Sequence, residues 1–266
     1  YGAMILMLLT LVFSSEVLAK THTTTASQKS HLTKASNKQV SSKQEYSRNS
    51  AKSSSLPDLR KYPSGTPRKK AFLRTVMPYI TSQNAAITAE RNWLISKQYQ
   101  GQWSPAERAR LKDIAKRYKV KWSGNTRKIP WNTLLERVDI IPTSMVATMA
   151  AAESGWGTSK LARNNNNLFG MKCMKGRCTN APGKVKGYSQ FSSVKESVSA
   201  YVTNLNTHPA YSSFRKSRAQ LRKADQEVTA TAMIHKLKGY STKGKSYNNY
   251  LFAMYQDNQR LIAAHM

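Results

Sequence analysis

The sequence places a single carboxylate where acid–base chemistry could occur. Glu153 is the only acidic residue between Asp139 and Glu196, although the chain carries a formal net charge of +30. The spacing of apolar residues predicts a helix that starts at Pro142 and carries Glu153 at its C-terminal end, on an apolar face. Burial and the negative end of the helix dipole both favour the protonated carboxyl group. A carboxylic acid that keeps its proton near neutral pH can serve as a general acid in glycosidic bond cleavage.

The residues after Glu153 favour this catalytic interpretation over a partly exposed helix-terminal glutamate without a chemical role. The chain continues as Glu153-Ser-Gly-Trp-Gly-Thr-Ser-Lys-Leu-Ala162 and then as Asn167-Leu-Phe-Gly-Met-Lys172. These two motifs, in this order, resemble the glucosaminidase domains of glycoside hydrolase family 73, which occur in bacterial autolysins and flagellar peptidoglycan hydrolases. The resemblance covers about residues 139–266. It implies a mainly α-helical, lysozyme-like domain with a small β-hairpin lobe and a cleft between them for the glycan.

The same resemblance implies further residues of the site. Lys238-Gly-Tyr-Ser-Thr242 and the later Tyr247 resemble a Gly-Tyr-Ala-Thr segment of the family and the tyrosine that follows it. Because such tyrosines line the cleft near the cleaved bond in the family, Tyr240 and Tyr247 are predicted catalytic residues. The alternative is that both tyrosines only pack a loop. The predicted substrate contacts, through ring stacking or the N-acetyl group, are Phe169, Tyr188 and Asn167.

The sequence offers no clear second catalytic carboxylate. Most glycoside hydrolases use two, but the stretch Met171–Gln190 contains neither Asp nor Glu. The acidic residues after Glu153 are Glu196, Asp225, Glu227 and Asp257, all on predicted helices or their ends. Three options stay open: the substrate's own N-acetyl group acts as nucleophile with Tyr240 or Tyr247 orienting it, the enzyme is a lytic transglycosylase, or the domain binds glycan without cleaving it.

The two cysteines, Cys173 and Cys178, are separated by four residues that include Gly176. In an exported protein this spacing predicts a disulfide that closes a tight turn, with free thiols as the alternative. A metal site would need further Cys or His ligands nearby, and the sequence supplies none. No metal or organic cofactor is predicted.

Several predicted helices must position these residues. Residues 67–138 are expected to form a helical N-terminal region, and residues 139–266 the catalytic domain. Pro78 predicts a kink or break in the first helix, and Trp156 is expected to be a packing residue that positions Glu153. The stretch 169–191 is predicted to form the β lobe. The expected helices span about residues 68–80, 84–95, 104–118, 131–138, 142–154, 193–207, 226–237 and 248–264.

The first 66 residues differ in composition from the rest. Residues 1–19 are predicted to be a signal segment truncated at its start, because Met4–Phe13 is apolar and Val17-Leu-Ala19 has the form of a signal-peptidase site. The apolar run is too short to span a bilayer; an uncleaved anchor is the alternative. Residues 20–66 are rich in Ser, Thr and Lys. They are predicted to be a disordered basic linker, because they cannot bury enough surface to offset their ordering entropy.

The charge of this linker bears on partners and location. Between Lys20 and Lys70, twelve Lys and Arg residues face only Glu45 and Asp58. The linker is either a solvated tether or a segment attracted to an anionic wall or membrane surface. Nucleic acid would be the natural partner for such charge inside a cell, but the signal segment predicts export. We therefore expect a location in the periplasm or cell envelope and no nucleic-acid partner.

Together, the resemblance and the position of Glu153 imply an exported peptidoglycan hydrolase. It would cleave the glycan strand after N-acetylglucosamine, with Glu153 as the proton donor. Its expected partner is the glycan strand of peptidoglycan. A lytic transglycosylase and a non-catalytic peptidoglycan-binding protein are the alternatives.

Overall fold

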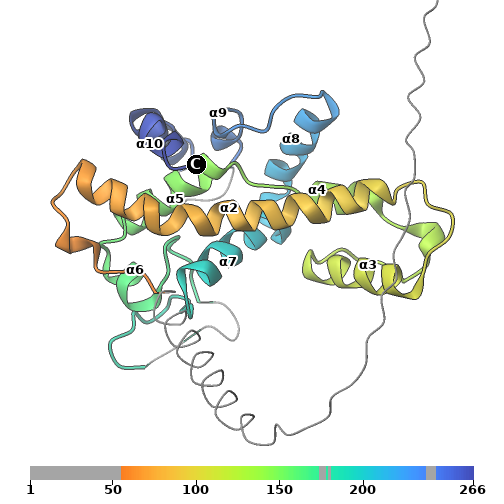
Figure 1. Ribbon diagram of the computed structural model, residues 1–266, viewed down its shortest axis with the longest axis horizontal. Coiled ribbons are helices and arrows are strands. Elements are labelled where there is room, and N and C mark those ends of the chain that lie inside the picture. The colour runs from red at the N-terminus through yellow and green to blue at the C-terminus, as the bar shows by residue number, and fades with distance from the viewer. Residues whose placement is uncertain (1–54, 174–177, 179–180, 238–243) are drawn as a thin grey trace, which may run out of the picture. The chain divides into compact units, whose positions relative to one another are not determined.

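The computed structural model describes residues 55–173, 178, 181–237 and 244–266 (Figure 1). The predicted signal segment, most of the predicted linker and Tyr240 lie outside these ranges. The described part is mainly helical, which confirms the predicted fold class and is consistent with a lysozyme-like helical domain. Its α-helices are α2 (Thr66–Ser96), α3 (Pro105–Arg117), α4 (Trp131–Arg137), α5 (Thr143–Ser154), α6 (Lys160–Asn165), α7 (Val194–Thr207), α8 (Ser212–Lys223), α9 (Ala230–Met233) and α10 (Lys245–Ala263). Its 3-10 helices are η1 (Leu59–Lys61), η2 (Thr126–Lys128), η3 (Pro209–Tyr211) and η4 (Ile234–Lys236).

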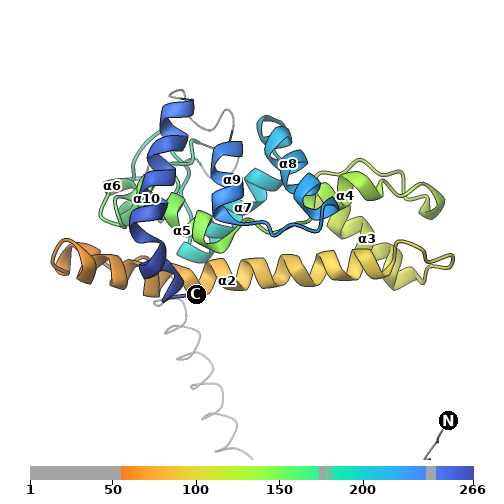
Figure 2. The same cartoon turned by 90° about the horizontal axis from the view of Figure 1, so that it is seen from above.

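In Figure 2, helix α2 runs along one edge of the described part of the chain, and the other labelled helices lie together on one side of α2. The helix is continuous over 31 residues and contains Pro78, so the helix does not break at Pro78, and the kink, the other effect expected of this proline, stays a prediction. A proline inside a helix removes one backbone hydrogen bond. Here the flanking residues Val76, Met77 and Ile80 are buried, and α2 packs against α5 and α7. That packing holds the helix together across the proline.

Helix α5 forms the centre of the core. Seven consecutive residues from Met145 to Ala151 are at most 1% exposed, as expected of a helix that is apolar all round. The helix packs against α2, α9 and α10. Full burial of each Met or Val side chain contributes roughly 1.5–3 kcal/mol, so the position of α5 is firmly fixed. Its last turn carries Glu153.

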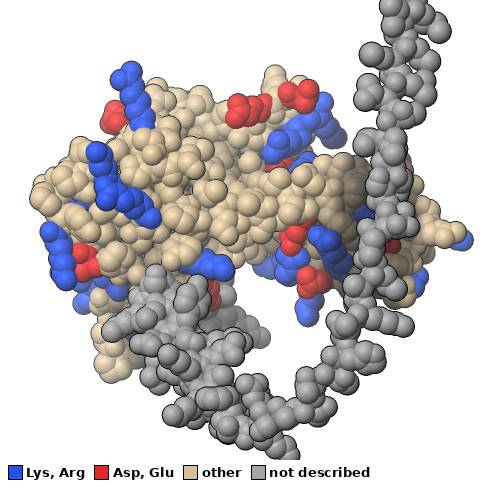
Figure 3. All heavy atoms as spheres, in the orientation of Figure 1, with Lys and Arg blue, Asp and Glu red and all other residues tan. Residues whose placement is uncertain are grey.

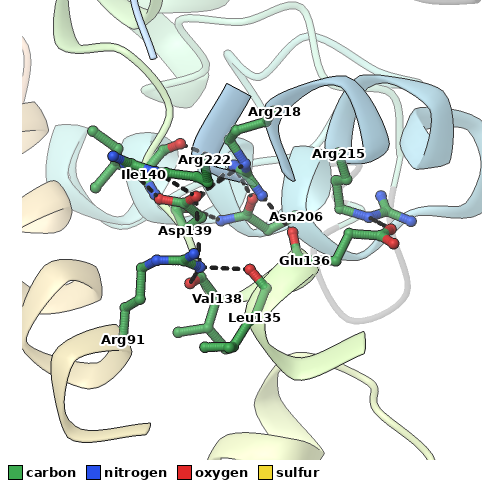
Figure 4. Close-up of polar contacts among 10 residues, drawn as sticks. All are labelled: Arg91, Leu135, Glu136, Val138, Asp139, Ile140, Asn206, Arg215, Arg218 and Arg222. Atoms are coloured by element: carbon green, nitrogen blue, oxygen red, sulfur yellow. Dashed lines mark hydrogen bonds and ion pairs between the residues drawn. The ribbon is translucent and has the colours of Figure 1, made fainter. Parts of the chain in front are cut away.

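A buried charged network fixes the segment that leads into α5 (Figure 4). Asp139 is 1% exposed. Its carboxylate accepts two hydrogen bonds from Arg222, at 2.9 and 3.1 Å, and forms ion pairs with Arg91 at 3.5 Å and Arg218 at 3.8 Å. Burial lowers the pKa of Arg218 to about 10, while the charge of Asp139 acts in the opposite direction. Arg218 therefore keeps its charge at neutral pH.

The same network ties down the backbone between α4 and α5. The Arg218 guanidinium donates to the main-chain carbonyls of Glu136, Asp139 and Ile140, at 2.8, 3.1 and 2.8 Å. Arg91 donates to the carbonyl of Val138 at 2.9 Å. Because these donors come from α2 and α8, three distant parts of the chain meet at the start of α5.

Three parts of the predicted architecture differ from the structure. The expected helix over 226–237 is reduced to α9 and η4, and α8 forms where no helix was predicted. The predicted β lobe contains two isolated antiparallel bridges among its described residues, Lys172–Tyr188 and Cys178–Ser189. Residues 55–65 belong to the folded unit and not to the predicted linker, because Leu56 and Leu59 are 8% and 0% exposed. Within the described ranges, no helix combines the length and apolar character needed to cross a membrane.

Candidate active site

Glu153 lies in the last turn of α5, where the chain turns sharply away. The turn is stabilised by Ser154, whose hydroxyl donates to the carbonyl of Ala150 at 2.6 Å and accepts from the backbone N–H of Gly157 at 2.8 Å. Gly155 ends the helix in the left-handed region, at φ +57°, where glycine is favoured. Glu153 itself is half-buried. The predicted position of the carboxylate, at the end of an apolar helix, matches the structure.

Two distant segments converge on this carboxylate. The hydroxyl of Tyr247, in the first turn of α10, donates a hydrogen bond to Glu153 Oε1. On the other side, a Cβ atom built at Gly170 would lie 3.2 Å from Glu153 Oε2. The two sequence motifs and one of the two predicted tyrosines are therefore brought together at one functional group.

The partner of Glu153 is neutral, and this shapes what the carboxylate can do. Within the part of the chain that the structure describes, Glu153 forms no ion pair with Lys or Arg. A cationic partner would favour the charged carboxylate. A tyrosine hydroxyl can donate to a carboxylate and accept from a carboxylic acid. The Tyr247–Glu153 hydrogen bond can therefore persist when Glu153 gains or loses a proton.

The loop that follows Glu153 is held by α2 and η1. Trp156 has φ +55° and packs edge-on against Phe72 of α2, with ring centroids 5.6 Å apart. Gly157 leaves no room for a side chain, since an added Cβ would lie 2.6 Å from Leu59 and 3.1 Å from Phe72. The expected packing role of Trp156 agrees with these contacts. Residues 55–96 thus contribute directly to the position of the site.

Asn167 was predicted to contact substrate, but the structure gives it a different role. It is 1% exposed, and its side chain bridges the backbone of Met171, accepting from the N–H at 3.0 Å and donating to the carbonyl at 2.8 Å. It also donates to the carbonyl of Ser189 at 3.0 Å. These bonds close the turn that presents Gly170 to Glu153, so we correct the assignment of Asn167 to a positioning role.

Phe169 requires the same correction. Its ring is 3% exposed and stacks on Tyr201 of α7, with centroids 4.0 Å apart and planes 2° apart. A sugar cannot reach a ring that is buried in this way. Phe169 instead anchors the Asn167–Met171 turn to the core.

Tyr188 and a residue that sequence analysis overlooked, Lys172, form a pair near this turn. Tyr188 is half-buried, so its predicted contact with substrate stays a prediction. The Lys172 ammonium donates to the Tyr188 hydroxyl at 3.0 Å and lies 4.2 Å from the centre of its ring. Lys172 was already present in the second motif, but nothing in the spacing singled it out.

The predicted disulfide lies next to this pair in the sequence. Cys173 and Cys178 are joined, with Cα atoms 5.2 Å apart, a usual separation for such a bond.

The four acidic residues that follow Glu153 in the sequence have surroundings that differ from those of Glu153. Glu196 caps α7 and accepts hydrogen bonds from the N–H and hydroxyl of Ser192, at 2.7 and 2.8 Å. Asp257 is exposed on α10, ten residues after Tyr247, which corresponds to about 15 Å along the helix. Asp257 therefore lies almost three helical turns from the residue that bonds Glu153. Asp225 and Glu227 are exposed between α8 and α9. Among the described residues, no cluster of His, Cys, Asp or Glu could hold a metal ion.

Residues 130–260 match the model of the Glucosaminidase family, described as mannosyl-glycoprotein endo-beta-N-acetylglucosaminidase. No solved structure matches the chain. The matched stretch begins just before α4 and ends within α10, so α2 and α3 lie outside it. The match places a glucosaminidase domain over the region that contains Glu153, Gly170 and Tyr247, and it supports a glycoside hydrolase of the endo-β-N-acetylglucosaminidase type that acts on a glycan.

Proposed function

We propose that this chain is an exported peptidoglycan hydrolase that cleaves the glycan strand after N-acetylglucosamine, with Glu153 as the general acid. One observation carries the proposal: Tyr247 and Gly170, from two distant segments, meet at the Glu153 carboxylate inside the glucosaminidase match. The motifs around Glu153 and Asn167 also resemble glycoside hydrolase family 73. The whole chain resembles the Bax protein of enteric bacteria, a member of the same superfamily, which supports the same assignment.

The chemistry follows from the surroundings of the carboxyl group. Protonated Glu153 donates its proton to the glycosidic oxygen as the bond to the departing sugar breaks, and the resulting carboxylate can then take a proton from the attacking water. Tyr247 stays hydrogen-bonded to Oε1 throughout, because its hydroxyl can either donate or accept. Because Gly170 has no side chain, it places no Cβ atom beside Glu153 Oε2, the oxygen that does not accept the hydrogen bond from Tyr247.

The second catalytic group is most simply supplied by the substrate. Glu196 is engaged with the N–H and hydroxyl of Ser192, and Asp257 lies almost three turns along α10 from Tyr247. The described part of the predicted β lobe contains no acidic residue. We therefore favour attack by the N-acetyl oxygen of the substrate, with Tyr247 or Tyr240 orienting that group. A lytic transglycosylase, which also needs only one acid, is the second candidate.

Digestion of purified sacculi, followed by mass spectrometry of the new sugar ends, tests the proposal. A reducing N-acetylglucosamine end supports the hydrolase, and an anhydromuramyl end supports the transglycosylase. A reducing muramic acid end would place the cut at the wrong bond. No new end would leave a peptidoglycan-binding protein as the function. Glu153→Gln serves as the inactive control and Asp257→Asn as the matched carboxylate control.

Export and the wall as partner rest on the predicted signal segment and the basic linker. On the face shown in Figure 3, Lys and Arg side chains lie at several separate places, often beside acidic side chains, and do not gather into one patch. Protease accessibility of the protein in intact and osmotically opened cells tests export. Full resistance in opened cells whose cytoplasm stays sealed would contradict it.

A further inference from the structure

Lys172 and Tyr188 form a cationic pair on the segment that faces the catalytic acid. The two residues lie directly opposite each other in an antiparallel bridge, so their side chains share one face. Their neighbours Met171 and Ser189 are 9% and 0% exposed and therefore fill the opposite, buried face. Lys172 is exposed and Tyr188 half-buried. The pair thus points away from the core.

The backbone that carries this pair is rigidly connected to Glu153. Gly170, whose Cβ position is 3.2 Å from Glu153 Oε2, precedes Lys172 by two residues. Two residues of chain span at most roughly 7 Å. Asn167 clamps both polar groups of the intervening Met171, and the Ser189 hydroxyl donates to the Lys172 carbonyl at 2.8 Å. The backbone that carries Lys172 is therefore held close to the Glu153 carboxylate.

The Lys172 ammonium has unused capacity for an anion. It carries three N–H donors, and within the described ranges its polar contact is the single bond to the Tyr188 hydroxyl, at 3.0 Å. No acidic residue occurs between Met171 and Gln190, and no described Asp or Glu forms an ion pair with Lys172. Tyr188 holds the cation through its hydroxyl and ring without neutralising it.

We propose that Lys172 and Tyr188 form a subsite for a carboxylate that the substrate carries next to the cleaved bond. In peptidoglycan this chemistry occurs in the lactyl group of the muramyl sugar and in the peptide attached to it, whereas chains of N-acetylglucosamine alone are neutral. The inference rests on the proposed function for its substrate. It adds that this enzyme selects an anionic glycan, through a charge-assisted hydrogen bond from Lys172.

Equilibrium binding by the full chain tests this independently of cleavage. Three probes are compared: muramyl glycan fragments with their peptides, fragments stripped of peptide so that the lactyl carboxylate is free, and a neutral N-acetylglucosamine oligomer. Lys172→Gln should weaken binding of a carboxylate-bearing probe about three- to tenfold and leave the neutral probe unchanged. Loss with the first probe alone identifies a peptide carboxylate, and loss with the second alone identifies the lactyl group.

Two variants provide matched controls. Lys186→Gln removes a charge from an exposed lysine of the same segment and should leave binding within about twofold of wild type, as expected for a screened surface charge. Tyr188→Phe keeps the ring and removes the hydroxyl, so it should give a smaller loss than Lys172→Gln. The proposal is overturned if Lys172→Gln and Lys186→Gln have the same effect, or if Lys172→Gln weakens all three probes equally. Failure of the hydrolase assignment would instead appear as unchanged sugar ends with selective binding intact.

Discussion

Two carboxylates lie near the two ends of helix α5, and their hydrogen-bond and ion-pair partners differ. Asp139, four residues before the helix, is 1% exposed and faces Arg91, Arg218 and Arg222. Glu153, in the last turn, is half-buried and accepts from the neutral hydroxyl of Tyr247. The first carboxylate has cationic partners, while the partner of the second is a neutral hydroxyl that can either donate or accept a hydrogen bond. Asp139, before the start of α5, thus has a structural role, and Glu153, at its end, is the candidate for chemistry.

The difference also predicts what each carboxylate contributes. Removing one member of a buried charge network leaves the remaining charges buried and uncompensated, which is strongly destabilising. Removing a half-buried carboxylate that bonds a hydroxyl leaves only a partly solvated hydroxyl behind. Loss of Asp139 should therefore act on folding, and loss of Glu153 should act on chemistry.

The largest expected effect is on the chemical side of this comparison. Glu153→Gln keeps the shape of the side chain and can still bond Tyr247, but it cannot donate the proton. We expect the rate of glycan cleavage to fall by at least 10²–10⁴-fold, with an unchanged midpoint of thermal unfolding. Release of soluble fragments from sacculi measures the rate. A variant that is folded and retains most of the wild-type rate would refute the assignment of Glu153.

On the structural side, Asp139→Asn should lower the free energy of unfolding by about 3–5 kcal/mol, as for other broken buried ion pairs. Urea denaturation measures the change. The matched control is Asp113→Asn, which breaks the exposed pair with Arg117 on α3, where Asp113 is 61% exposed; it should cost about 0.5 kcal/mol or less. Activity per folded molecule should stay near the wild-type value. Equal stability losses for the two variants would remove the special role of the network.

The neutral partner of Glu153 gives the next prediction. Tyr247→Phe should lower kcat roughly 10- to 100-fold, because a hydroxyl that positions the acid or the reacting amide is lost. Tyr250→Phe is the control, since Tyr250 lies on the same helix and is 53% exposed. The four remaining acids after Glu153 are also replaced, as Glu196→Gln, Asp225→Asn, Glu227→Gln and Asp257→Asn, and each should stay within about tenfold of wild type. If one of them is as inactive as Glu153→Gln while Tyr247→Phe works normally, a two-carboxylate mechanism holds.

The loop after Glu153 offers a smaller and more local test. Gly157 and Gly183 share φ +77°, but a Cβ would meet Leu59 at 2.6 Å at Gly157 and no described atom within 4 Å at Gly183. Gly183→Ala should therefore cost about 1 kcal/mol for backbone strain, and Gly157→Ala about 1–3 kcal/mol more for the clash. Only Gly157→Ala should also lower kcat. Equal thermal stability of the two variants would show that η1 does not support the site.

Local sequence patterns predicted the parts of the molecule whose causes are local. The apolar helix that ends at Glu153 and Gly155 is present as predicted. The pattern Ser104-x-x-Glu107 forms a reciprocal capping box. At Ser193-x-x-Glu196 only the bond from the Glu196 N–H to the Ser193 hydroxyl is formed, because the Glu196 carboxylate accepts from Ser192 instead. These features depend on residues within one or two turns of each other, so a short window of sequence contains their causes.

The parts that sequence analysis missed depend on tertiary contacts. Helix α8 was not predicted, because its buried face includes Arg215 and Arg218, which are 1% and 0% exposed although arginine is ordinarily a surface residue. Leu59 was assigned to the linker because polar residues surround it, yet it packs at Gly157. Asn167 and Phe169 belong to the correct motif, but spacing cannot distinguish a side chain that touches substrate from one that holds the turn.

A third carboxylate, Glu107, should have the smallest effect on stability and the clearest dependence of that effect on pH. It bonds Lys97 and the backbone N–H of Ser104, and the hydrogen bond from Lys97, followed by those from Ser104, lowers its pKa from 4.5 to about 2. Because the folded state holds this proton less tightly than the unfolded state, its stabilising contribution is complete above about pH 4.5. That contribution is lost as the pH falls towards 2. Glu107→Gln should lower the midpoint of thermal unfolding by a few degrees at most at pH 7, as for a part-exposed pair. The difference from wild type should shrink steadily below pH 4.5. A difference that stays constant down to pH 2 would mean that the shape of the cap, and not the charge of Glu107, stabilises α3.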